Sequence, residues 1–94
     1  MKYFDWNEDK NVELRAEREV CFENVVIAII EGRILDIFTH PNQQKYPNQK
    51  VLVIEIDNYA YLVPFTEDEQ KIFLKTIIPS RKATRFYIIN KNSL

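Results

Sequence analysis

Four basic side chains lie close together near the end of the sequence, in the stretch KTIIPSRKATRFY. Lys75, Arg81, Lys82 and Arg85 all fall within residues 75–87, which contain no Asp or Glu. Guanidinium and ammonium groups gathered in this way are the side chains that bind phosphate. The stretch therefore indicates a site for a polyanion, and the simpler alternative is a basic surface that only keeps the protein in solution.

The charge of the whole chain hides this asymmetry. The formal net charge is only −1. Residues 1–70 hold seven Lys and Arg against all fourteen Asp and Glu, whereas residues 71–94 hold six Lys and Arg and no acid. The two parts thus carry −7 and +6. Because a polyanion responds to the local potential rather than to the total, the split allows nucleic-acid binding.

A helix is predicted over residues 81–88 and should present the basic residues. Pro79 ends the strand before it, and Ser80 is a suitable N-cap. At helical spacing Ala83, Phe86 and Tyr87 share one face and should pack on a sheet. Arg81, Lys82 and Arg85 share the other face. Arg81 and Arg85 are an i,i+4 pair of like charge, which costs a helix about 0.2–0.5 kcal/mol. The free N–H groups of the first turn would assist phosphate binding.

Other residues could take part in chemistry, but their spacing is less specific. Lys75 alternates with Leu74 and Thr76 and should point away from them, either toward a ligand or simply into solvent. His40 is the only histidine and lies at the junction of a strand and a loop, where it is either solvated or a general acid or base. Three acids could pair as carboxylates, and four aromatics could stack on bases or simply pack: Asp36, Glu55 and Asp57, and Tyr3, Trp6, Tyr59 and Tyr61.

The rest of the chain predicts the scaffold that carries these residues. A short strand is expected at residues 2–6, followed by helices over 8–18, with Asn7 as N-cap, and over 22–32, ending at the only glycine, Gly32. Four strands should follow as an antiparallel meander: 33–39, 51–57, 59–65 and 71–79. Asp57 and Asn58 suit a tight hairpin turn. With the helix at 81–88, this order predicts the α+β class.

Composition bounds the kind of protein. Ninety-four residues, 46% hydrophobic and 29% charged, indicate one globular domain over residues 1–94. No apolar run is long enough for a membrane span, and the start lacks a secretory leader, so we expect a cytoplasmic protein without a membrane partner. One cysteine, Cys21, allows neither an internal disulfide nor a zinc site, and we expect it to be buried at a helix start. The single glycine excludes a glycine-rich phosphate loop. We expect no cofactor and no metal.

Two motifs resemble the BrnT-like toxins of prokaryotic type II toxin–antitoxin modules. The chain opens with FDWNEDKN and enters its second helix through VCFENV; it closes with TIIPSRKATRFY. The family has an aromatic-Trp-Asp-type opening followed by Lys-Asn, which is Lys10-Asn11 here. Its closing stretch of the Ile-Ser-x-Arg-Lys-Ala-Thr-Arg type matches residues 78–85. The resemblance covers residues 3–87, and the closing motif is the more specific of the two.

The resemblance implies a RelE-like fold and a small ribonuclease. Such a toxin cuts RNA without a metal ion and so inhibits translation and growth. It is neutralised by a cognate ribbon-helix-helix antitoxin, through which alone the complex reaches operator DNA, as a dimer or heterotetramer. Carried onto this chain, the basic cluster is Arg81, Lys82 and Arg85. Lys75, Lys82 or His40 would supply proton transfer.

This chain departs from the family at one position that bears on function. The family often shows Lys-His-Gly before the second helix, whereas this chain has Glu17-Arg18-Glu19. Arg18 or His40 would then replace that histidine. The alternative function is a non-catalytic module that binds an antitoxin or RNA without cleaving it.

Overall fold

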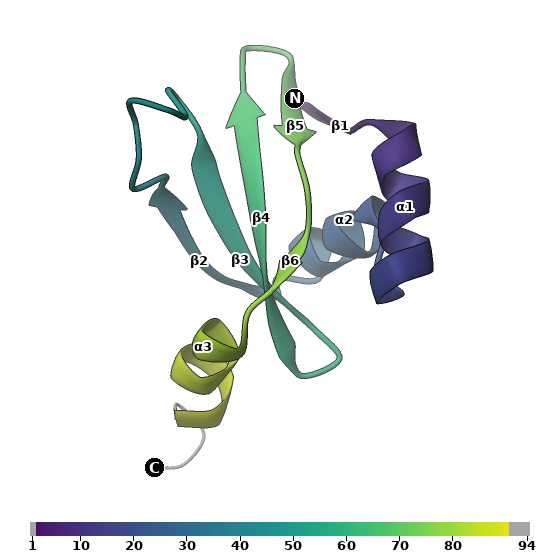
Figure 1. Cartoon of the computed structure of the whole chain (residues 1–94), viewed down its shortest axis with the longest axis vertical. Helices are drawn as coiled ribbons and strands as arrows, with labels where there is room; N and C mark the ends of the chain where they lie inside the picture. The colour runs from purple at the N-terminus through teal and green to yellow at the C-terminus, as the bar shows by residue number, and fades with distance from the viewer. Residues whose placement is uncertain (1, 91–94) are drawn as a thin grey trace.

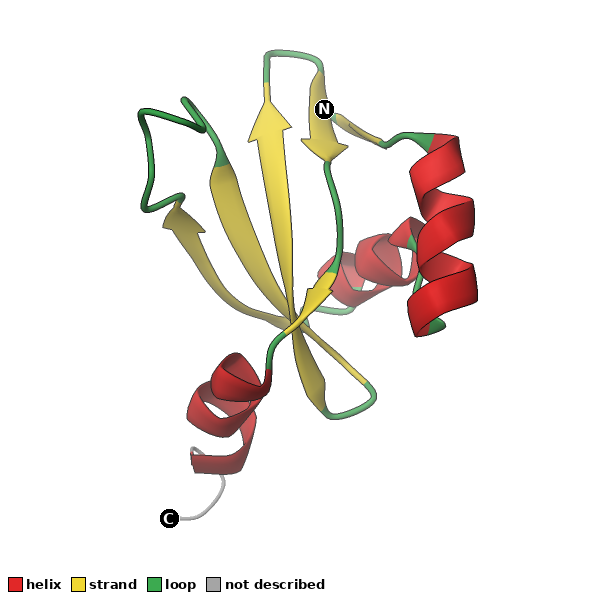
Figure 2. Cartoon of the chain, viewed as in Figure 1, coloured by secondary structure: helices red, strands yellow, loops and turns green. Residues whose placement is uncertain are grey.

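The computed structural model describes residues 2–90, and it has the predicted mixed α+β composition. Six strands form one sheet in the order β1-β5-β4-β3-β2, and β6 pairs with β4 beyond the end of β5. Figure 1 shows α1 and α2 together on one side and α3 at the opposite end of the molecule, and Figure 2 separates helices from strands. Within residues 2–90, no helix is long and apolar enough to span a bilayer.

The two N-terminal helices begin and end close to the predicted residues. Helix α1 (Glu8–Arg18) starts after Asn7, whose side chain accepts a hydrogen bond from the Lys10 N–H. Helix α2 (Phe22–Ile30) is followed by Gly32 with φ of 75°. A left-handed residue after a helix satisfies carbonyl groups that have no partner inside it, and glycine adopts that conformation without steric cost. The helical spacing of this segment therefore outweighs its β-branched composition.

The hairpin of β3 (Lys50–Ile56) and β4 (Tyr59–Glu67) turns at the predicted pair. Asp57 and Asn58 have φ of 52° and 64°. Two consecutive positive φ angles match the right-handed twist of the strands, and Asn and Asp tolerate them better than most residues. The edge strand β2 (Ile34–Thr39) then pairs with β3 on its other side.

The last predicted strand, 71–79, is interrupted. It forms β5 (Lys71–Leu74) and β6 (Ile78–Pro79), which both pair with β4. Phe65 faces Leu74 and Tyr61 faces Pro79, so four steps along β4 oppose five steps along the other segment. The extra residue is the signature of a β-bulge, which reverses the side-chain alternation. The sheet is thus larger than the expected four-stranded meander.

The predicted strand at residues 2–6 is present as β1 (Tyr3–Asp5). It lies parallel to β5, with Tyr3 opposite Lys71 and Asp5 opposite Phe73. All other strand pairs in the described chain are antiparallel. The first strand of the chain therefore closes the sheet beside one of the last.

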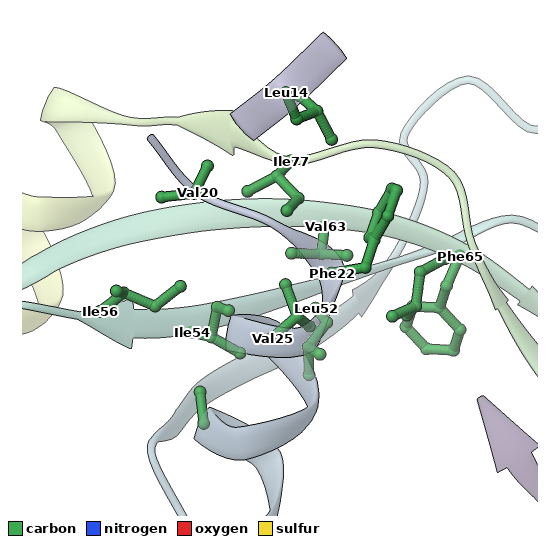
Figure 3. Close-up of a cluster of buried hydrophobic side chains, with 12 residues drawn as sticks. Leu14, Val20, Phe22, Val25, Leu52, Ile54, Ile56, Val63, Phe65 and Ile77 are labelled. Carbon is green, nitrogen blue, oxygen red and sulfur yellow. The ribbon is translucent and has the colours of Figure 1, made fainter. Parts of the chain in front are cut away.

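The main hydrophobic core lies between the sheet and the two N-terminal helices (Figure 3). The bulge places both Leu74 and Ile77 in this core with no exposed surface, although they are three residues apart. A second, smaller cluster on the opposite face of the sheet is covered by the C-terminal helix. The buried members of the main core are Leu14, Val20, Phe22, Val25, Ala28, Leu52, Ile54, Ile56, Val63, Phe65, Leu74 and Ile77.

The C-terminal helix begins where the sequence predicts but is not one regular α-helix. The α-turn α3 (Arg81–Ala83) continues as the π-helix η1 (Thr84–Ile89), and the Asn90 N–H bonds the Arg85 carbonyl. In a π-helix hydrogen bonds join residues five apart, so side chains recur at a longer interval than in an α-helix. Ala83 is buried, as predicted, but Phe86 is 65% exposed. The prediction that Phe86 packs on the sheet is wrong.

Candidate nucleic-acid interface

The residues of the closing motif divide into those that fix the C-terminal helix and those that point into solvent. Ser80 caps the helix by accepting a hydrogen bond from the Ala83 N–H at 3.0 Å. Thr84 is buried; its hydroxyl accepts from the Ala60 N–H of β4 at 2.8 Å and donates to the Ser80 carbonyl at 2.7 Å. The small, buried Ala83 allows the close approach to β4 that these bonds need. The helix is therefore held rigidly on the sheet.

The basic residues of the motif lie on the outside of this anchored turn. Arg81, Lys82 and Arg85 are all exposed. Lys75 is also exposed and lies at the bulge, where its N–H donates to the Pro64 carbonyl. Leu74 before it enters the main core, whereas Lys75 is exposed. The prediction that Lys75 points away from Leu74 and Thr76 stays a prediction.

None of these four cations has a carboxylate partner within the described chain. Ion pairs are made instead by six other basic residues: Lys2, Lys10, Arg15, Arg33, Lys50 and Lys71. Fixed charges without internal partners keep their full attraction for an external anion, whereas ion-paired cations are partly neutralised. The asymmetry seen along the sequence is therefore an asymmetry in space.

His40 lies apart from the basic residues. Its Nδ1 accepts a hydrogen bond from the Asn42 N–H at 3.0 Å, and its ring contacts Tyr46 with centroids 4.5 Å apart. The backbone N–H of His40 donates a hydrogen bond to the Gln49 carbonyl. The loop that it begins, between β2 and β3, lies at the end of the sheet opposite α3 (Figure 1). His40 thus organises this loop, and the structure does not bring it to the cluster.

Arg18, the other residue expected to replace the histidine of BrnT-like toxins, is hydrogen-bonded within the fold. Arg18, in the last turn of α1, donates a hydrogen bond from Nη1 to the carbonyl of Ile77. This bond ties α1 to the segment between β5 and β6, directly before the closing motif. Arg18 therefore helps to fix the segment between β5 and β6, which leads into the closing motif.

The three candidate carboxylates do not pair with one another. Glu55 accepts a hydrogen bond from the Asn58 N–H and lies near Arg33, and Asp57 is in the hairpin turn. Asp36 accepts hydrogen bonds from the Tyr87 hydroxyl and from the Ile37 N–H. The Tyr87 bond lowers the pKa of Asp36, and the same bond raises the pKa of Tyr87. It also fastens η1 to the edge strand β2.

Most of the candidate aromatic residues are used in packing. Trp6 stacks on Phe22 with ring centroids 5.6 Å apart, and Tyr59 and Tyr61 contact each other edge-on at the same distance. Both Trp6 and Tyr61 pack against the main core. Tyr3 is more than half exposed, on β1. None of the four lines the groove between the sheet and the C-terminal helix.

The sequence reasoning missed a groove beside the cations. It has a volume of about 360 Å³ and lies between the sheet and the C-terminal helix. Phe38 of β2 is 38% exposed there, and Phe86 forms the outer wall. Its signal in the sequence was weak, because the exposure of Phe86 depends on the π-helical spacing. The lining residues are Phe38, Val53, Leu62, Ser80, Lys82, Ala83, Phe86 and Tyr87.

Asn11 of the opening Lys-Asn motif is a second residue whose importance the sequence reasoning missed. It has no exposed surface. Its Oδ1 accepts from the Phe22 N–H at 2.7 Å, and its Nδ2 donates to Glu23 Oε1 at 2.7 Å. The bond to Asn11 is the largest cause of the lowered pKa of Glu23. Asn11 therefore joins α1 to the start of α2. Cys21 is buried at that start, as predicted.

No protein-family model, curated protein or solved structure gives a significant match to this chain. Among residues 2–90, no three His, Cys, Asp or Glu side chains are grouped so that they could hold a metal ion. The properties of the interface therefore have to be argued from the residues themselves. It consists of one apolar groove and four cations without ion-pair partners among residues 2–90: Arg81, Lys82 and Arg85 on the anchored helix, and Lys75 just after the end of β5.

Proposed function

We propose that this chain is the toxin of a type II toxin–antitoxin module, a metal-independent endoribonuclease similar to the BrnT-like family. The observation that carries the proposal is the set of four exposed cations without internal partners: Lys75, Arg81, Lys82 and Arg85. Ser80, Ala83 and Thr84 of the closing motif hold the helix that carries three of these cations. Two helices against one face of a mostly antiparallel sheet support the finer inference of a RelE-like arrangement.

Stabilising the transition state of metal-independent RNA cleavage requires mainly fixed positive charge. In RNA cleavage without a metal ion, the 2′-oxygen attacks the adjacent phosphorus, the bond to the 5′-oxygen of the next nucleotide breaks, and a cyclic phosphate forms. Negative charge on the phosphoryl oxygens grows toward the transition state. Arg81 and Arg85 would bind these oxygens, and one well-placed donor of this kind contributes about 3 kcal/mol. Because the helix is anchored by Thr84, they need little reorganisation.

Proton transfer is assigned to the two lysines. One group must take the proton of the 2′-hydroxyl and another must protonate the leaving 5′-oxygen. His40 lies on a loop at the far end of the sheet, so it does not fit either role. Lys75 and Lys82 are exposed and have no ion-pair partner among residues 2–90. We therefore retain them as the acid and base candidates.

A second candidate function is a non-catalytic module that binds RNA or an antitoxin. It is favoured by the position of His40, which lies on a distant loop, and by Asp36, whose carboxylate is already hydrogen-bonded to the hydroxyl of the groove residue Tyr87. A binding module needs only the cations and the groove. The two functions differ in one property, the cleavage of RNA.

Cleavage of total RNA by the purified chain in EDTA tests the proposal. Wild type should produce fragments that end in a cyclic phosphate, and an Arg81→Ala/Arg85→Ala variant should not. Wild type and the double variant should have the same far-UV circular dichroism spectrum, since neither arginine side chain makes a hydrogen bond or ion pair within residues 2–90. Binding of RNA without cleavage by wild type would favour the second candidate. Cleavage that persists in the double variant would contradict the assignment of the site.

A further inference from the structure

Apolar side chains beside the cations stay exposed although the C-terminal helix covers part of this face of the sheet. Phe38 of β2 is 38% exposed and Phe86 of η1 is 65% exposed, whereas Leu62 is half-buried and Val53 is buried. A contiguous apolar patch of this kind, with a charged rim, marks an interaction site.

The helix side of the groove's rim is positively charged, and the Asp36 carboxylate on β2 is engaged by the Tyr87 hydroxyl. Lys82 lines the groove itself, and Arg81 and Arg85 are its neighbours on the helix. No carboxylate of residues 2–90 pairs with any of them. A ligand that fills the groove with apolar groups and carries acids beside them would satisfy both features.

The two hydroxyl groups of the groove are each already engaged in one hydrogen bond within the protein. Ser80 Oγ accepts from the Ala83 N–H, and the Tyr87 hydroxyl donates to Asp36. A nucleobase inside the groove would therefore find few partners for its polar edge, and buried polar groups without partners are costly. Apolar side chains carry no such requirement. The groove fits a protein better than a base.

A second copy of this chain is a poor occupant. Pairing of two copies across this face would bring two sets of unpaired cations together, and like charges disfavour the contact. Antiparallel pairing of two β2 edges is also hindered, because Asp36 already accepts the Ile37 N–H at 2.8 Å. The occupant should instead be negatively charged.

We infer that this groove binds an acidic segment of a partner protein, with apolar side chains against Phe38 and Phe86 and carboxylates on Arg81 and Lys82. The segment would cover the same cations that RNA needs. Docking would then exclude RNA by competition for charge, and only this consequence rests on the proposed function. The inference that a partner docks here depends only on the groove and its charged rim.

Selection from a displayed library of random-sequence peptides, against the intact chain, tests the inference. Selected peptides should combine aliphatic or aromatic residues with Asp or Glu. A synthetic copy of the most enriched peptide is then titrated against wild type, Phe86→Ser and Lys82→Glu. Each variant should bind about tenfold more weakly. Ile30→Ser is the matched control, because Ile30 is 77% exposed on α2, away from the groove, and its loss should leave binding unchanged.

Competition separates this inference from the ribonuclease proposal. The peptide should displace a poly-uridine oligonucleotide from wild type, and Phe86→Ser should weaken the peptide but not the oligonucleotide. Selection of peptides without acids, or of none that depend on Phe86 and Lys82, overturns the inference and leaves RNA cleavage untouched. Loss of oligonucleotide binding in Phe86→Ser with normal peptide binding also overturns it, and would make the groove a base-stacking site.

Discussion

The salt dependence of RNA binding gives a quantitative test of the four cations. For single-stranded nucleic acid, the slope of log K against log salt concentration is about −0.7 for each phosphate that a protein neutralises. If Lys75, Arg81, Lys82 and Arg85 each neutralise one phosphate, the slope should be about −2.8. Replacing Arg81 and Arg85 by alanine should reduce it to about −1.4.

The structure explains why this double substitution should change binding without unfolding the protein. Neither guanidinium makes a hydrogen bond or ion pair within residues 2–90, and both side chains are exposed. The helix is held by Ser80 and Thr84, which the substitution leaves in place. Alanine also has a higher helix propensity than arginine, although only slightly.

Fluorescence anisotropy with a labelled 2′-O-methyl oligonucleotide, which has no 2′-hydroxyl to react, measures the slope without cleavage. The matched control is Lys10→Ala/Arg15→Ala, which removes the same charge from α1, where both residues have carboxylate partners. We expect the control to change the slope by less than half as much. An equal change in the two variants would show that RNA responds only to total charge, and would refute the reasoning from the unpaired cluster.

Three further predictions concern the scaffold. Asn11→Ala should lower the free energy of unfolding in urea by about 1–3 kcal/mol, because it leaves the Phe22 N–H buried without a partner; a loss under 1 kcal/mol would contradict this. Tyr87→Phe should lower stability most near neutral pH: the lowered pKa of Asp36 makes the bond's contribution disappear as pH falls through that pKa, and the raised pKa of Tyr87 makes it disappear as pH rises through that one. Unfolding curves of wild type and variant should therefore converge at both extremes of pH, and a constant difference would exclude the linkage. Gly32→Ala should cost about 1–2 kcal/mol in thermal unfolding, from its positive φ alone, since no atom lies within 4 Å of an added Cβ.

Local chemistry made the helix starts and the hairpin predictable from the sequence. Asn7 and Ser80 cap their helices with their own side chains, and Gly32 ends α2 through its own backbone freedom. Asp57 and Asn58 likewise adopt the positive φ angles that the turn requires. These outcomes depend on residues only a few positions apart, so a pattern in the sequence contains the information.

The features that the sequence did not predict depend on contacts between distant segments. The bulge between β5 and β6 exists because both Leu74 and Ile77 enter the core against β4. Asn11 is important because it meets the N–H of Phe22 in another helix. The spacing of Leu74 and Ile77 by three was visible in the sequence, but it could equally have indicated a helix.

The candidate site was predictable in its charge but not in its shape. The cluster of Lys and Arg follows from composition, and the structure leaves all four side chains exposed. The groove requires a π-helical turn that moves Phe86 out to the rim, and no rule of spacing predicts that turn. The separation of His40 from the cluster also required the topology, because residues 40 and 81 belong to different ends of the sheet.

The parallel pairing of β1 with β5 has a consequence for synthesis of the chain. Tyr3 is made 68 residues before its partner Lys71. At about 5–20 residues per second, β1 waits roughly 3–14 s before its partner exists. The sheet is therefore completed only after β5 and β6 have been made, and the basic helix that follows β6 is made later still.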